Sequence, residues 1–270
     1  AVCGKALTLA KAHYFLETAH PDIALLDINL EGKLEGIEFA KSLRNVVCDE
    51  SEIICGICPP FVFLKDICRV LEGCGIFVAA QNIHSEKTGA YTGEISASMV
   101  KEVGCTHVLL GHSERRHIFH ETDSFINAKI KAALSVNLKP IFCVGETLDN
   151  REDERTEYVI RNQLKEGLHG ISAGHIKELV IAYEPVWAIG TGKTALPEQA
   201  NEVHSFIRST ITDGYGKDIA NSVYIQYGGS VKPENAKELM AQPEIDGLLV
   251  GGASITFESF FKIIETAAKY

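Results

Sequence analysis

Residues 179–192 read Leu-Val-Ile-Ala-Tyr-Glu-Pro-Val-Trp-Ala-Ile-Gly-Thr-Gly. Five apolar residues lead without a break to Glu184, and a proline follows at once. A short run that is apolar at every position is typical of a parallel strand with both faces buried. The stretch therefore predicts a buried strand over residues 179–184, with a loop beginning where Glu184 ends it.

The same pattern recurs along the whole chain, with helical segments between the runs. Apolar residues return at helical spacing most clearly in residues 61–72, 124–136 and 198–212. The predicted strands are residues 23–28, 52–57, 76–81, 107–111, 140–145, 179–184, 222–228 and 247–250. Strict alternation predicts a parallel sheet with right-handed crossovers. Eight such units in 270 residues favour an α/β protein with one (β/α)8 TIM barrel, a single domain over residues 1–270.

The beginning of the chain does not fit this count. Residues 6–19 predict an amphipathic helix ahead of the first strand. We therefore expect an extra N-terminal helix within a helical extension over residues 1–20, followed by an atypical first strand within residues 21–32.

Composition narrows the function classes. The formal net charge is −10, which repels nucleic acid and anionic lipid, so we expect no nucleic-acid partner. No run of 18 apolar residues occurs, so we expect no membrane span. The first residues carry no basic segment followed by an apolar one, which predicts no signal peptide and a cytoplasmic location.

Cysteine spacing gives little support for a metal or redox centre. Cys55 and Cys58 form a CxxC pair, but no second pair and no paired histidines lie nearby, and two prolines follow directly. Cys105 and Cys143 lie in or beside apolar runs, where cysteine serves as a small hydrophobic residue. We expect structural cysteines and no metal site.

The ends of the strands carry the candidate chemistry, because a barrel of this kind builds its active site from the loops at the strand C-termini. His112 directly follows an apolar run and can act as an acid, a base or a hydrogen-bond donor. Glu184 ends another run, and a buried carboxylate is costly unless it is paired or used. The residues after Glu184 resemble a hinged lid, stiffened by Pro185 and freed by the glycines at 190 and 192.

Glycine pairs follow the last two predicted strands, at residues 228–229 and 251–252. Glycines let the backbone approach a ligand closely and point N–H groups at it. Loops at these places are the usual phosphate cradle of this fold. The pairs predict an anion site near Glu184.

Five motifs together resemble the triosephosphate isomerase family. They lie at residues 80–82, 89–94, 111–116, 182–192 and 227–231, and read Ala-Gln-Asn, Gly-Ala-Tyr-Thr-Gly-Glu, Gly-His-Ser-Glu-Arg-Arg, Ala-Tyr-Glu-Pro-Val-Trp-Ala-Ile-Gly-Thr-Gly and Tyr-Gly-Gly-Ser-Val. The resemblance covers roughly residues 33–270. It implies interconversion of dihydroxyacetone phosphate and glyceraldehyde 3-phosphate through an enediolate, without a cofactor, in glycolysis and gluconeogenesis.

The resemblance also implies roles for particular residues. Glu184 would move the carbon-bound proton, His112 would polarise the carbonyl as a neutral imidazole, and Glu114 would lie beside them; the family is itself a standard example of such pKa tuning. Residues 84–94 resemble a protruding loop that docks into a second subunit, which implies a homodimer. The phosphate would be held by backbone N–H groups of Gly190, Ser230, Gly251 and Gly252.

The first strand departs from the family pattern. The family carries an Asn-x-Lys segment there, but an ungapped run back from residue 34 puts Asp27 at the asparagine position and Asn29 at the lysine position. Without that cation we expect an impaired enzyme. The alternative is a catalytically inactive barrel that retains phosphate binding or serves as a scaffold.

Residues 1–37 are similar to part of a response-regulator receiver domain. The aspartate that ends the receiver strand accepts a phosphoryl group, and Asp27 occupies that place. The receiver's acidic pair is missing, so the motif lacks its structural context. The resemblance implies a chimera in which a receiver-like segment stands in place of the first barrel strand, with phosphorelay signalling as the third alternative.

Overall fold

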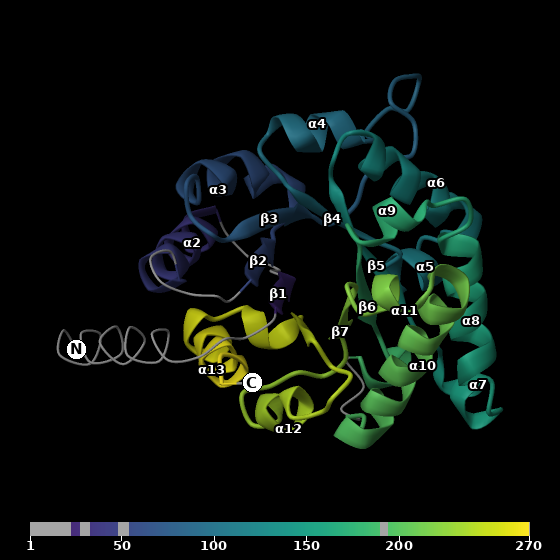
Figure 1. The fold of residues 1–270 in the computed structure, drawn as a ribbon. Coiled ribbons are helices and arrows are strands. Elements are labelled where there is room, and N and C mark those ends of the chain that lie inside the picture. Colours follow the sequence, from purple (N-terminus) through teal and green to yellow (C-terminus); the bar gives the residue numbers. More distant parts are fainter. Residues whose placement is uncertain (1–22, 28–32, 48–53, 190–193, 270) are drawn as a thin grey trace.

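A computed structural model describes residues 23–27, 33–47, 54–189 and 194–269. Eight parallel strands form a closed barrel in sequence order, and helices surround it (Figure 1). The predicted α/β barrel is confirmed. The strands are β1 (Ile23–Asp27), β2 (Ile54–Cys58), β3 (Phe77–Ala80), β4 (His107–Leu110), β5 (Lys139–Val144), β6 (Val180–Tyr183), β7 (Tyr224–Tyr227) and β8 (Gly247–Val250).

The connections are helical throughout the described residues. The α-helices are α2 (Lys33–Val47), α3 (Leu64–Val70), α4 (Ala97–Glu102), α5 (Ser113–His117), α6 (Asp123–Ser135), α7 (Leu148–Glu152), α8 (Thr156–Gly167), α9 (Ala173–Ile176), α10 (Pro197–Tyr215), α11 (Lys217–Ala220), α12 (Ala236–Met240) and α13 (Phe257–Ala267). Three 3-10 turns accompany them: η1 (Phe61–Phe63), η2 (Val186–Ala188) and η3 (Gly252–Ser254).

Predicted boundaries differ from the observed ones for physical reasons. The helix predicted over residues 61–72 splits into η1 and α3, because the prolines before it fix an extended entry. Strand β6 ends one residue earlier than predicted, yet the N–H of Glu184 still donates to the carbonyl of Val144 at 2.8 Å. The helix predicted over residues 6–19 lies outside the described residues.

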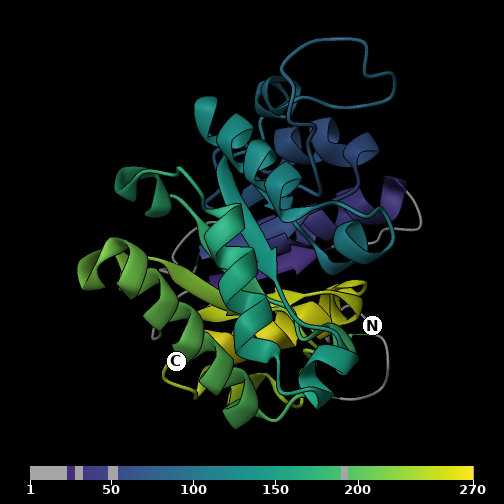
Figure 2. The ribbon, with the colours of Figure 1, turned by 90° about the vertical axis from the view of Figure 1, so that its right-hand side faces the viewer.

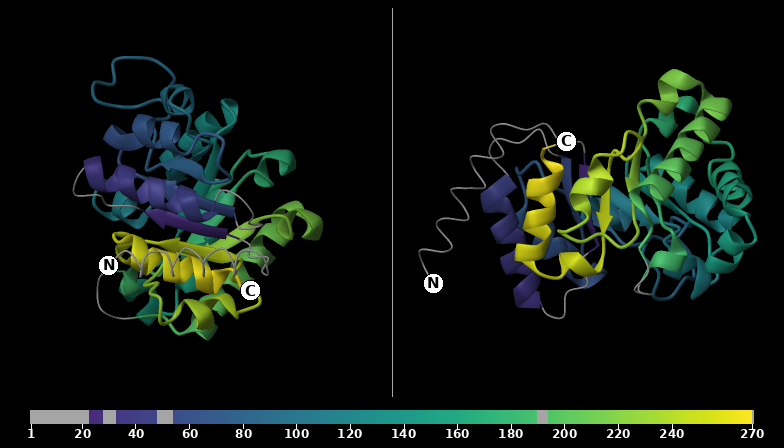
Figure 3. Two further views of the ribbon diagram at one scale, coloured as in Figure 1. Left: turned by 90° about the vertical axis from the view of Figure 1, so that its left-hand side faces the viewer. Right: turned by 90° about the horizontal axis from the view of Figure 1, so that it is seen from below.

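The atypical first strand completes the barrel. Strand β1 pairs with β2 on one side and with β8 on the other, both in parallel. The first and last helices of the described residues meet where the barrel closes. Helices α2 and α13 lie side by side, and the rings of Phe39 and Phe257 are 5.9 Å apart, edge to face (Figure 3). Residues 23–27 therefore form a strand with a neighbour on each side, as a closed barrel requires.

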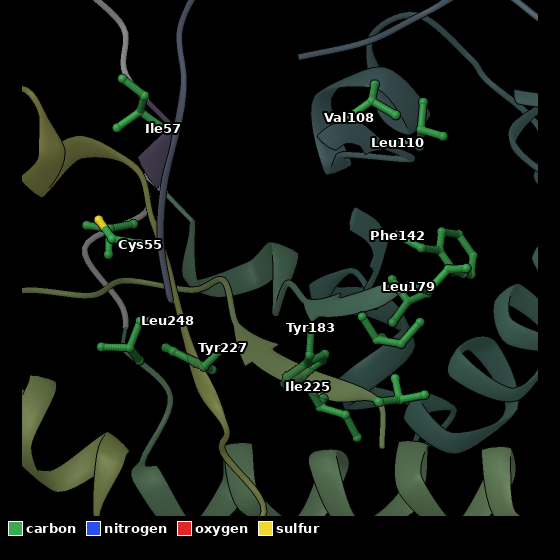
Figure 4. Packing of buried hydrophobic residues seen from close by; sticks show 14 of the residues in the cluster. Cys55, Ile57, Val108, Leu110, Phe142, Leu179, Tyr183, Ile225, Tyr227 and Leu248 are labelled. Carbon is green, nitrogen blue, oxygen red and sulfur yellow. The ribbon is translucent and has the colours of Figure 1, made fainter. Parts of the chain in front are cut away.

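Two apolar layers hold the barrel together. The outer layer fills the space between strands and helices, and part of it is shown in Figure 4. A smaller cluster contains Cys58, Ala79, Leu109, Ile141, Cys143, Val180, Ala182 and Leu249. Alternate residues of each strand point to opposite faces, so Cys55 belongs to the first cluster and Cys58 to the second. The two thiols of the CxxC pair therefore face opposite sides of β2 and cannot share one metal ion.

None of the helices in the described part of the chain combines the length and the apolar character needed to cross a bilayer.

Candidate active site

Glu184 follows β6 at the C-terminal end of the barrel, and its side chain is 2% exposed. Its Oε1 atom lies 2.9 Å from Nε2 of His112, and its Oε2 atom accepts the backbone N–H of Ser113 at 2.9 Å. Each carboxylate oxygen thus has a donor. This arrangement satisfies a buried charge, and it aims a base at the edge of the barrel where substrates bind in this fold.

His112 follows β4 and is the N-cap residue of α5. Its Nδ1 atom accepts the backbone N–H of Glu114 at 3.4 Å. A nitrogen that accepts a hydrogen bond carries no proton, so the neutral ring has its N–H on Nε2, the atom that faces Glu184. The start of α5 therefore sets the tautomer of the imidazole and directs its donor into the site.

Glu114 lies beside this pair but points toward solvent. Its side chain is 68% exposed, and its Oε2 atom is 3.8 Å from Nδ1 of His112. Both residues line a cavity of about 310 Å³ that also includes Gln81 and Asn82. The structure thus brings the three sequence-predicted residues together, with Glu184 buried, His112 partly buried and Glu114 exposed.

Glycines make room for the carboxylate. A Cβ at Gly145, after β5, would overlap the carbonyl oxygen of Glu184. A Cβ at Gly228 would come within 3.1 Å of Cγ of Glu184, and one at Gly229 would overlap the hydroxyl of Tyr227. The glycine pair after β7 therefore has a packing reason that is independent of any ligand. Gly145 was not singled out from the sequence.

Arg116 fixes the turn that carries His112. Its guanidinium donates to the carbonyl of Gly111 at 2.7 Å and to the carbonyl of Cys143 at 3.0 Å, and it pairs with Asp123. Gly111 has a φ of 77°, which favours glycine. One arginine thus ties β4, β5 and α6 together below the imidazole.

A buried ion network lies next to the cavity. The Nζ atom of Lys129 lies 2.6 Å from Oε1 of Glu121 and donates to Oδ1 of Asn82 at 2.9 Å. Arg115 pairs with the same oxygen of Glu121 at 2.6 Å. Burial lowers the pKa of Lys129, and the contact with Glu121 opposes that shift. No local pattern predicted this network, because the hydrogen bond between Lys129 and Asn82 joins residues 47 positions apart.

A second buried carboxylate holds the segment after Glu184. Glu146 follows β5 and is fully buried, and its Oε1 atom accepts Nε1 of Trp187 at 2.9 Å and the hydroxyl of Tyr183 at 3.1 Å. Arg151 lies 3.1 Å from the same oxygen and stacks on the Trp187 ring at 4.7 Å. The apolar tip of the predicted lid is therefore anchored by the indole N–H of Trp187, which donates to Oε1 of Glu146.

The predicted phosphate residues are placed only in part. Ser230 follows β7, and its carbonyl accepts Nδ2 of Asn235 at 2.8 Å. Gly251 and Gly252 follow β8 into η3, and a Cβ at either would meet only open space. Gly190 lies outside the described residues. The three that are described follow β7 and β8, at the same end of the barrel as Glu184.

The segment in which the resemblance leads us to expect a lysine is also described only in part. The backbone of β1 ends at Asp27, paired with Cys58. Asn29 lies outside the described residues. Among the described residues, no three His, Cys, Asp or Glu side chains are grouped so that they could hold a metal ion.

Comparisons with known proteins identify the family. The model of the family described as "Triosephosphate isomerase" matches residues 28–267. Proteins named triosephosphate isomerase from Carboxydothermus hydrogenoformans and Fusobacterium nucleatum are 53% and 49% identical, each over 86% of this chain and 92% of the relative. The one from Chloroherpeton thalassium is 51% identical over 87% of this chain and 93% of its own. The chain belongs to the triosephosphate isomerase family, a family of isomerases.

Proposed function

We propose that this chain interconverts dihydroxyacetone phosphate and glyceraldehyde 3-phosphate, at a rate lowered by the residues of its first strand. The observation that carries the proposal is the 2.9 Å contact between the buried carboxylate of Glu184 and Nε2 of His112. A base and a neutral N–H donor at one site are what an enediolate mechanism needs. Family membership supports the same reaction.

In the proposed mechanism Glu184 removes a proton from the carbon next to the carbonyl. The N–H of His112 donates a hydrogen bond to the carbonyl oxygen as negative charge develops there, and an enediolate forms. The hydroxyl proton of the enediolate moves to the former carbonyl oxygen, and the protonated Glu184 returns its proton to the former carbonyl carbon. The oxygen that lost its proton becomes the new carbonyl, which gives the other triose phosphate. Glu114 stays at the exposed edge of the site. Its carboxylate lies 3.8 Å from Nδ1 of His112 and acts on the imidazole through its charge. The reaction requires no cofactor.

We assign substrate phosphate binding to the backbone N–H groups of Gly190, Ser230, Gly251 and Gly252. Three of these follow β7 and β8, where the fold usually binds phosphate. Residues 184–192 serve as the lid, and Trp187 holds it through Glu146. Closing the lid excludes water and protects the enediolate from losing phosphate.

The proposed loss of rate rests on Asp27 and Asn29. The family lysine supplies a positive charge beside the substrate phosphate, and Asn29 supplies none. Loss of one preorganised donor typically costs about 3–4 kcal/mol, or roughly 10²–10³ in rate. Asp27 adds an anion near an anionic substrate, which increases the cost.

A coupled assay of glyceraldehyde 3-phosphate isomerisation tests the proposal. Glu184→Ala is the control, because it removes the base and any remaining activity then comes from the host's enzyme. Activity of the parent above this control supports the proposed reaction. Asn29→Lys combined with Asp27→Asn should raise kcat/KM by at least tenfold; an unchanged value would contradict the proposed impairment.

The second candidate is a barrel that binds phosphate without turnover, and the absence of lysine at position 29 favours it. Calorimetry with inorganic phosphate distinguishes the two. Phosphate binding by the parent, together with activity equal to that of Glu184→Ala, would select the second candidate.

We further propose a homodimer, formed through residues 84–94. This loop projects from the barrel between β3 and α4 (Figures 1 and 2), and a hydrogen bond of 2.8 Å from the N–H of His84 to the carbonyl of Ile95 closes its base. Exposed apolar side chains lie in the connections after β2 and β4, with Val62 78%, Ile118 64% and Phe119 61% exposed. Such side chains are suited to cover a partner's loop.

We also propose one domain over residues 1–270, a cytoplasmic location, and a place in glycolysis and gluconeogenesis. The family match begins at residue 28, and the receiver-like interpretation of residues 1–37 gains no support from the comparisons. We propose no phosphorelay role for Asp27.

A further inference from the structure

Two free thiols lie close together on the outside of the barrel. The Sγ atom of Cys68, in α3, is 3.9 Å from the Sγ atom of Cys105, which precedes β4. The two cysteines are 37 residues apart in sequence. Cys68 is half-buried and Cys105 is buried. Neither contributes to the candidate active site.

Cys68 opens onto a cavity of about 740 Å³ between α3 and α4. These helices are neighbours around the barrel (Figure 1), and the cavity reaches the first residues of β3 and Thr106, just ahead of β4. It therefore lies toward the N-terminal ends of the strands, opposite the end where Glu184 and His112 meet. Its volume is in the range of roughly 300–1,000 Å³ that small-molecule sites occupy.

The charges around the cavity have both signs. Lys65 and Arg69 line it from α3, within one helical turn of Cys68. Acidic side chains complete the lining at Asp66, Glu72 and Glu102. Such a lining suits a small zwitterionic molecule with carboxylates and an ammonium group, since each charge finds an opposite one.

The two thiols are chemically unequal. The hydrogen bond with Cys105 lowers the pKa of Cys68 despite its partial burial. The same hydrogen bond and burial raise the pKa of Cys105. A thiolate is the nucleophile in disulfide exchange, and cations nearby favour it. Cys68 is thus suited to attack a disulfide first, and Cys105 is suited to react in a second step with the product on Cys68.

The other described cysteines are less suited than Cys68 to react with a solute. Cys55, Cys58 and Cys143 are buried, and burial raises the pKa of Cys55 to about 12. Cys74 lines the same cavity but is disulfide-bonded, so it offers no thiol. Among the described residues, Cys68 is the free thiol that a solute can reach.

We infer that Cys68 is a modification site for a low-molecular-weight disulfide, with Cys105 as its resolving thiol. The Cys68 thiolate attacks one sulfur of the small disulfide, forms a mixed disulfide and releases one small thiolate. Cys105 then loses its proton to that thiolate and attacks the sulfur of Cys68, which releases the second small thiolate. Two protein thiols are oxidised to one disulfide, and one small disulfide is reduced to two thiols.

The geometry allows the second step after a modest movement. A disulfide needs its sulfurs about 2 Å apart, which is closer than the present 3.9 Å. Gly104 leaves room for the two sulfurs to approach, because a Cβ atom at this position would lie 3.1 Å from Cβ of Cys68. The product would fasten α3 to the chain entering β4.

Oxidised glutathione is the probe for the test. The native protein is incubated with it, quenched with an alkylating reagent and mapped by peptide mass spectrometry. We expect a Cys68–Cys105 cross-link in the parent, glutathione retained on Cys68 in Cys105→Ser, and neither product in Cys68→Ser. Cys105→Ala is the second resolving-thiol variant, and circular dichroism checks that each variant is folded.

The outcomes separate clearly. The cross-link should also raise the midpoint of thermal unfolding by several degrees, reversed by dithiothreitol, because it constrains the unfolded chain. An unmodified Cys68 in the parent would overturn the inference. The inference would also be overturned if glutathione stayed on Cys68 in the parent, as we expect in Cys105→Ser. Cys105 would then not displace glutathione from Cys68.

Discussion

The Nε2 atom of His112 lies 2.9 Å from Oε1 of Glu184, although the two residues follow different strands and are 72 positions apart. Backbone N–H groups complete the pair: that of Ser113 donates to Glu184, and that of Glu114 donates to the other nitrogen of the imidazole. The start of α5 thus orients both the base and the donor.

The first prediction concerns His112→Gln. The variant removes the imidazole N–H that we propose to stabilise the enediolate, so kcat should fall by roughly 10²–10³ while KM changes little. The assay is best run in the Asn29→Lys, Asp27→Asn background, where we expect higher activity. A fall in KM without a fall in kcat would argue against an electrophilic role.

The second prediction concerns the anchor of the lid. Glu146→Gln should destabilise the protein by about 2–4 kcal/mol, because a fully buried carboxylate that pairs with Arg151 is lost. Trp187→Phe removes one donor and should cost about 1–2 kcal/mol. Denaturant unfolding of both variants and of the double variant gives their coupling energy. Strict additivity would mean that the Trp187–Glu146 hydrogen bond does not form in solution.

The third prediction is a loss of stability in acid. Burial lowers the pKa of both His107 and His204 to about 3. Their ordinary value is 6.5, so below that pH the unfolded chain binds protons that the folded chain does not. The free energy of unfolding should therefore fall from about pH 6.5 toward pH 3, by roughly 1.4 kcal/mol per pH unit for each histidine.

Replacement of one histidine checks this assignment. His204→Gln should flatten the dependence of the urea midpoint on pH between 7.5 and 5. His175→Gln, in the exposed helix α9, is the matched control and should keep the parent's slope. Parallel curves for the parent and His204→Gln would remove His204 as a cause.

The fourth prediction compares two glycines. Gly145→Ala should destabilise by at least about 2 kcal/mol and abolish activity, because the new methyl group overlaps the backbone of Glu184. Gly214→Ala, in α10, meets nothing within 4 Å and should stabilise by about 0.5–1 kcal/mol. Thermal unfolding measures both. Equal effects would show that the tight packing at Gly145 is not maintained.

The fifth prediction concerns subunit association. Ile118→Asp places a charge on the proposed interface and should shift the protein from dimer to monomer in sedimentation velocity. Tyr158→Asp is the control, since Tyr158 is 58% exposed on α8, away from the loop of residues 84–94. A parent that sediments as a monomer at every concentration would contradict the homodimer itself.

The class of fold and two candidate site residues, His112 and Glu184, could be predicted from the amino-acid sequence. The eight predicted strand runs are mainly apolar, as parallel strands with both faces buried are, and their alternation with helical segments predicted a closed parallel barrel. His112 and Glu184 could be found because each is a polar residue that ends such a run. The lysine missing from the first strand could be noticed only from the resemblance, and its consequence stays a prediction.

Which side chains meet across the molecule could not be predicted from the amino-acid sequence. The carboxylate of Glu146 looks like any other glutamate in sequence, yet folding buries it against Trp187 and Arg151. Lys129 sits in an ordinary helix, and its partners Asn82 and Glu121 come from two other loops. The thiols of Cys68 and Cys105 meet for the same reason. Strand and helix periodicity is set by local backbone geometry, whereas contacts between distant segments depend on the rotation of each helix against the barrel, which no local pattern encodes.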